Sequence, residues 1–75
     1  MRPLHEIATE ILQVWHKPNY GAIPYLKAMN YLSSTNDYYM LDSGESIILY
    51  ALSNMNTFRG ADARRIKAEL KEHLL

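Results

Sequence analysis

The sequence contains no cysteine, which excludes disulfides and thiolate metal sites as sources of stability. Its longest apolar run is too short to span a bilayer, and Met1-Arg2-Pro3 does not lead into the apolar segment of a secretory signal. Eight basic and eight acidic residues give zero net charge, so the chain as a whole has no attraction for nucleic acid or anionic membrane. We therefore expect one soluble, cytoplasmic domain over residues 1–75, without a membrane segment.

Motifs for catalysis and metal binding are also lacking. There is no glycine-rich phosphate loop, no Gly-x-Ser-x-Gly elbow and no His-Glu-x-x-His pair. The only imidazoles are His5, His16 and His73. The first two are separated by about 16 Å along one helix and cannot bind the same ion. Three carboxylates near the second loop could perform acid–base chemistry only if burial separated their pKa values: Asp37, Asp42 and Glu45. Turn and capping roles account for them, so we expect no enzyme, no metal and no cofactor.

What the sequence does contain is a strongly apolar segment, Ser43–Phe58, that we predict to be one helix. Its stripe at helical spacing consists of Ile47, Ile48, Ala51, Leu52, Met55 and Phe58. Asp42 and Glu45 form a capping-box pattern at its start, and Arg59-Gly60 supplies a cation and a glycine at its end. A buried strand over 46–52 is the alternative, because periodicity alone does not separate the two. Since Leu49 and Tyr50 add a second apolar side, this helix is expected to be the central one.

Two amphipathic segments are predicted before it. A helix over Pro3–His16 begins with proline at a position where no N–H is needed, and it ends before Pro18. Its buried stripe is Leu4, Ile7, Ala8, Ile11, Leu12 and Trp15. A turn at 19–21 leads to a second helix that ends near Ser33, and its inward side is Ala22, Tyr25, Leu26, Met29 and Leu32. The polar residues 33–37 predict a loop, and Tyr38–Leu41 is expected to be an irregular segment or half-turn lying across the core.

A last helix is predicted over Ala61–His73, with Ala63, Ile66 and Leu70 as its apolar seam. The expected fold is therefore all-α, a compact bundle of four short helices in which the third, about 43–58, is central. A chain of this length buries only about 60% of its unfolded surface, so association with another chain would add stability. A homodimer, a complex with a partner protein and a monomeric bundle all remain open at this point.

Tyrosine is unusually frequent, and most of it is clustered. Five of the six tyrosines lie between positions 20 and 39: Tyr20, Tyr25, Tyr31, Tyr38 and Tyr39. Tyrosine is enriched at protein interfaces because its rigid ring provides contact at low entropic cost, although a small core also places tyrosines at its rim. The cluster favours a protein-binding surface formed by the second helix and the loop after it.

Nucleic-acid binding is the alternative function. The last two helices, joined at Arg59-Gly60, have the gross pattern of a helix-turn-helix motif. The candidate contacts are Arg59, Arg64, Arg65, Lys67 and Lys71. Against this, Asp62 would face phosphate, and the pI near 6.8 is far below that of a typical DNA-binding domain.

Two stretches carry a resemblance to a known group. Tyr20-Gly21-Ala22-x-Pro24-Tyr25-Leu26-x-Ala28-Met29, followed by Thr57-Phe58-Arg59-Gly60-x-x-Ala63-Arg64-x-Ile66-Lys67-x-Glu69-Leu70, is similar to small uncharacterised helical proteins of bacteriophages and mobile elements. The resemblance covers about 20–70 and implies a bacterial or phage setting and an accessory binding role, without assigning a role to any residue. We expect a small helical module that binds another protein or itself.

Overall fold

The computed structural model describes all 75 residues and contains four α-helices. These are α1 (Leu4–Val14), α2 (Ile23–Met29), α3 (Gly44–Ser53) and α4 (Ala61–His73), with a 3-10 turn η1 (Tyr20–Ala22) leading into α2. Two short strands, β1 (Tyr38–Tyr39) and β2 (Asp42–Ser43), pair antiparallel. The predicted four-helix, mostly α-helical architecture is confirmed, and the small sheet is an addition to it.

The first helix follows its predicted apolar stripe closely. Leu4, Ile7, Ala8 and Ile11 are buried, whereas Leu12 is exposed. Pro3 lies one position earlier than expected, as the N-cap, and α1 ends at Val14 rather than His16. The first free N–H groups of α1, those of residues 4 and 5, donate to the carbonyls of residues 33 and 32. The segment that follows α2 therefore caps the start of α1 by accepting hydrogen bonds from its free N–H groups.

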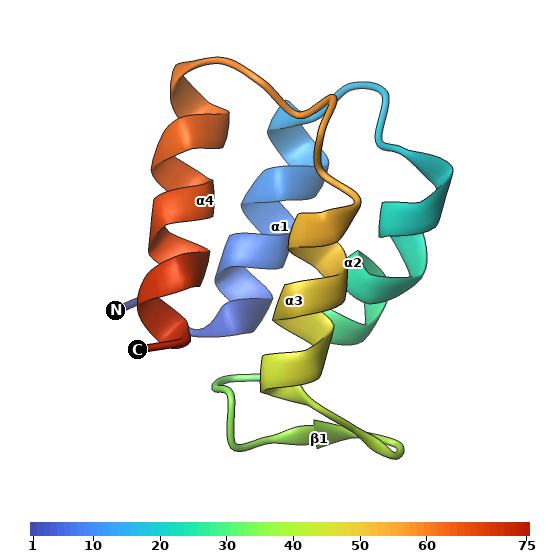
Figure 1. Cartoon of the computed structure of the whole chain (residues 1–75), viewed down its shortest axis with the longest axis vertical. Coiled ribbons are helices and arrows are strands. Elements are labelled where there is room, and N and C mark those ends of the chain that lie inside the picture. Colours follow the sequence, from blue (N-terminus) through green and yellow to red (C-terminus); the bar gives the residue numbers. More distant parts are fainter.

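The prediction for Tyr38–Leu41 is wrong. Instead of lying across the core, these residues form half of a β-hairpin in which Tyr39 faces Asp42 and Met40-Leu41 makes the turn. The hairpin projects beyond the helices, below α3 in Figure 1. The expected capping box is also wrong, because Asp42 lies in β2. The N-cap of α3 is Ser43, whose Oγ accepts a hydrogen bond from the Ser46 N–H at 3.2 Å.

The apolar segment in the third quarter of the chain is helical, so the strand alternative is excluded, but the helix is shorter than predicted. It ends at Ser53, and Met55 and Phe58 reach the core from the following loop. Gly60 does not terminate this helix as predicted. It precedes α4 as N-cap with φ 108°, a left-handed conformation that favours glycine. The predicted bounds of α4 are confirmed.

All four helices contribute to one apolar core that contains no buried polar or charged side chain. Both α1 and α3 contact α2 and α4, and Trp15 and Phe58 stack with ring centroids 5.0 Å apart. The two chain ends lie side by side (Figure 1), where the Arg2 carbonyl is 2.8 Å from His73 Nε2. None of the helices combines the length and hydrophobicity needed to cross a membrane.

Candidate functional site

The five candidate tyrosines do not form one continuous surface. Tyr31, which follows α2, stacks on Tyr39 of the hairpin with the ring centroids 5.4 Å apart, and Tyr38 precedes Tyr39 in β1. Tyr25 instead stacks on Tyr50 of α3 at 5.3 Å. Tyr20 stands apart, exposed in the turn before α2. The structure thus places three of the five on or against the hairpin, of which two are stacked: Tyr31, Tyr38 and Tyr39.

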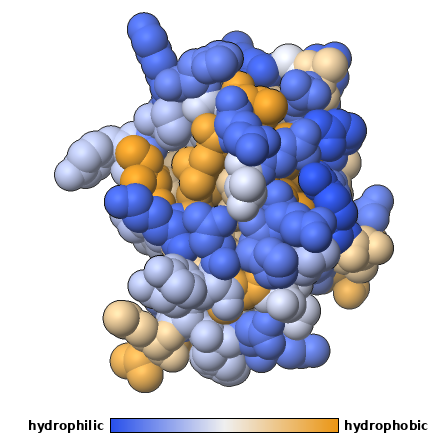
Figure 2. Space-filling view, turned by 180° about the vertical axis from the view of Figure 1, so that it is seen from behind, coloured by the Kyte–Doolittle hydropathy of each residue, from blue (hydrophilic) through white to orange (hydrophobic).

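The most exposed apolar side chains of this region belong to the hairpin turn, which the sequence did not indicate. Met40 and Leu41 are 82% and 95% exposed, and Tyr38 in the preceding strand and Tyr31, which stacks on Tyr39, are 68% and 76% exposed. Figure 2 shows an apolar protrusion at the lower left, where the hairpin comes to lie after the half-turn from Figure 1. We call Met40 and Leu41 the hairpin tip.

The backbone of the hairpin tip is in an unusual conformation. Met40 has φ 57°, the only positive φ of a non-glycine residue in the chain. A positive φ at the first central position alone is the pattern of a type II′ turn, which normally has glycine there. For a residue with a Cβ, this conformation costs about 1–2 kcal/mol. An exposed methionine held in a position suited to glycine is not explained by stability.

The base of the hairpin is closely connected to the bundle. The Asp37 carboxylate accepts hydrogen bonds from the N–H groups of Ser33 and Ser34, at 2.8 and 3.2 Å. The Gly44 N–H donates to the Asp37 carbonyl at 2.7 Å. A side chain at Gly44 would collide with the Ser34 carbonyl oxygen. These contacts fix the direction in which the hairpin tip projects, and they give Asp37 a structural role.

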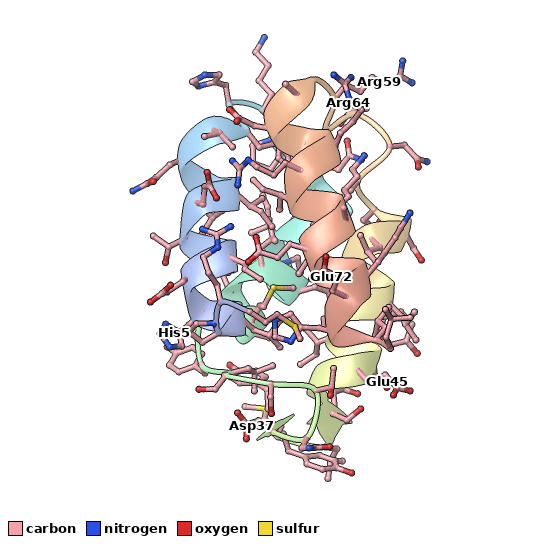
Figure 3. All side chains as sticks on the ribbon, turned by 90° about the vertical axis from the view of Figure 1, so that its left-hand side faces the viewer. His5, Asp37, Glu45, Arg59, Arg64 and Glu72 are labelled. Carbon is pink, nitrogen blue, oxygen red and sulfur yellow. The ribbon has the colours of Figure 1, made fainter.

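Charge is segregated along the chain. All eight lysines and arginines lie outside residues 28–58, a stretch that contains three carboxylates and no histidine. Figure 3 shows Asp37 and Glu45 at the hairpin end of the molecule and Arg59 and Arg64 at the other end. The hairpin tip is therefore an apolar surface in an acidic environment.

Two of the five candidate nucleic-acid contacts are engaged within the fold. Arg65 bridges Glu10 and Asp62, with nitrogen–oxygen distances of 2.6 and 3.2 Å, and the hydrogen bond to Glu10 raises the pKa of its guanidinium. Lys67 Nζ donates to the carbonyls of Met55 and Phe58, at 2.9 and 2.6 Å. Burial lowers the pKa of this ammonium group.

The other three basic candidates are more accessible. Arg59 Nε donates to the Asn56 carbonyl at 3.1 Å, while Arg64 and Lys71 are exposed and form no ion pair. The connection between α3 and α4 spans residues 54–60. A helix-turn-helix motif has a turn of only about three or four residues, so the geometry of that motif is not reproduced.

A shallow, open depression of about 450 Å³ lies on the outer side of α2. It is lined by Tyr20, Ile23, Pro24 and Lys27, so that its walls are largely apolar and one cation stands at its edge. We call it the α2 depression. No group of three or more potential ligand side chains is close enough together to hold a metal ion.

Comparison with models of protein families, with curated proteins and with solved structures found no match to this chain.

Proposed function

We propose that this protein is a small helical protein–protein interaction module and that the hairpin tip is its main contact surface. The observation that carries the proposal is the pair Met40 and Leu41, almost fully exposed on a turn whose backbone favours glycine. Exposed apolar residues on a rigid support are typical of binding anchors. The neighbouring tyrosines could supply the surrounding contacts that exclude water from such anchors.

 Tyr31, Tyr38 and Tyr39 remain part of the proposed surface, where they flank the hairpin tip. Tyr20 and Tyr25 lie away from it, on and before α2. The proposal keeps α3 as the central helix, because α3 follows the hairpin directly and, like α1, contacts both α2 and α4. It also keeps the cytoplasmic location expected from the sequence and the phage or mobile-element setting implied by the resemblance. The nucleic-acid alternative stays a prediction.

The double variant Met40→Gly, Leu41→Asn tests the proposal. Gly-Asn suits the backbone of this turn, so the variant removes both apolar side chains and relieves the positive φ of Met40. We expect its thermal midpoint to stay the same or to rise by several degrees, since about 1 kcal/mol corresponds to roughly 4–8 °C in a domain of this size. Its binding to the partner should be lost.

Binding is measured by photo-crosslinking from position 38 in cells of the source organism, followed by quantitative mass spectrometry. Leu12→Gln, which removes an exposed leucine from α1, is the matched control and should form the wild-type adduct. If the double variant forms the same adduct in the same yield, the hairpin tip is not the contact surface and the proposal fails.

A further inference from the structure

We infer that the hairpin tip of one copy docks into the α2 depression of a second copy, so that the chain associates head to tail. This inference rests on the proposed function, because it identifies the partner of the hairpin tip as another molecule of the same protein. It draws on three observations: the shape of the two surfaces, their opposite charges and the unfavourable charge of the symmetric alternative.

The two surfaces match in shape and polarity. The hairpin tip is a narrow projection that presents two aliphatic side chains, Met40 and Leu41. The α2 depression is open, about 450 Å³ in volume, and has Tyr20, Ile23 and Pro24 in its wall. Insertion of the tip would remove apolar surface on both sides from water, which is the main driving force of association.

The charges at the two surfaces are opposite. Asp42 follows the hairpin tip directly and is exposed, and Lys27 stands at the edge of the α2 depression. Neither residue forms an ion pair within its own chain. Docking of the tip would bring this carboxylate of one copy to the lysine of the next. Complementary charges of this kind set the orientation of a complex and speed its formation.

A symmetric contact between two hairpin tips is disfavoured by the same charges. It would bring together two copies of residues 28–58, each with three carboxylates and no basic residue. Like charges facing each other are repulsive, and no lysine or arginine of this stretch could compensate. Unless the rotation closes a ring, the head-to-tail contact leaves one tip and one depression free in each dimer, so association continues.

Sedimentation velocity on the full chain over a range of concentrations tests the inference, with the protein itself as the probe. The wild type should form dimers and larger species as its concentration rises, less so at high salt. Leu41→Asp alters the tip and Lys27→Glu alters the depression, and each should weaken association by about ten- to a hundredfold. Lys17→Glu, the same charge change at an exposed lysine outside the depression, should leave association unchanged.

Mixing the two defective variants is the decisive step. The intact tip of Lys27→Glu fits the intact depression of Leu41→Asp, so an equimolar mixture should form a heterodimer that cannot grow further. A wild type that stays monomeric at every concentration, or a mixture that stays monomeric, overturns the inference. An effect of Lys17→Glu equal to that of Lys27→Glu also overturns it. A monomeric wild type whose position 38 still crosslinks to a different protein would leave the proposed function standing.

Discussion

At the scale of single residues, Lys67 has a role that its sequence context hides. Its spacing from Arg64 and Lys71 places it in a basic stripe, yet its Nζ donates to two carbonyls of the loop before α4 and lies 5.8 Å from the centre of the Phe58 ring. The acceptors are backbone atoms of residues 55 and 58, whose direction depends on the path of the loop. This contact could not be predicted from side-chain types alone.

Replacing Lys67 with methionine should destabilise the fold. Lys67→Met keeps most of the aliphatic stem but removes the donor to the carbonyls of Met55 and Phe58. The expected cost is about 1–3 kcal/mol, the usual penalty for a lost hydrogen-bond partner in a partly buried position. Thermal unfolding followed by circular dichroism measures it. Lys71→Met, one turn further along α4 and exposed, is the control and should stay within about 0.5 kcal/mol of wild type. Equal midpoints for the two variants would contradict the role assigned to Lys67.

At the scale of elements, the sequence was sufficient to predict a helix where its local signals agree with the packing. The bounds of α4 and the apolar stripe of α1 were predictable because helical spacing decides both. The end of α3 was not, because it depends on distant contacts. Asn19 Nδ2 donates to the Asn54 carbonyl at 2.8 Å, and Thr57 Oγ1 donates to Asn19 Oδ1 at 2.9 Å. The hairpin was missed because Met40-Leu41 has none of the glycine or asparagine that normally marks such a turn.

The start of α3 provides a direct test of the corrected cap. Ser43→Ala removes the Oγ that accepts from the Ser46 N–H, and the expected loss of stability is about 1 kcal/mol. Asp42→Ala removes the residue that the capping-box pattern suggested, but its side chain makes no cap contact, so the expected change is within about 0.5 kcal/mol. Urea unfolding of both variants gives the comparison. A larger loss of stability for Asp42→Ala than for Ser43→Ala would contradict the Ser43 cap and favour the predicted capping box of Asp42 and Glu45.

At the scale of the whole molecule, α1 and α4 are connected by a network of ion pairs. Arg2 contacts Glu10 at 2.8 Å and Glu69 at 2.6 Å, and Arg65 contacts Glu10 from the other side at 2.6 Å. Arg65 and Glu10 are 55 residues apart in sequence, and Glu69 and Arg2, which precedes α1, are 67 apart, so no pattern within either helix predicts these pairs. The tyrosine cluster also could not be resolved from the sequence. Its members are close in sequence, but only the fold decides which of them share a surface.

This network predicts how stability depends on pH. Hydrogen bonds from Arg65 and then Arg2 lower the pKa of Glu10 from 4.5 to about 2, and the bond from Arg2 lowers that of Glu69. A carboxylate with a lowered pKa in the folded state stabilises the fold above its unfolded pKa, and this contribution is lost as the pH falls through the folded value. The difference in free energy of unfolding between wild type and Glu10→Gln should therefore be largest well above pH 4.5 and shrink towards pH 2. Because the network is partly exposed, we expect a difference of about 1 kcal/mol or less at neutral pH.

Urea unfolding at a series of pH values measures this difference, with Glu72→Gln as the control because Glu72 is exposed on α4 and forms no ion pair. A difference for Glu10→Gln that stays constant down to pH 2, or that equals the control throughout, would show that the network contributes nothing to the stability of the fold.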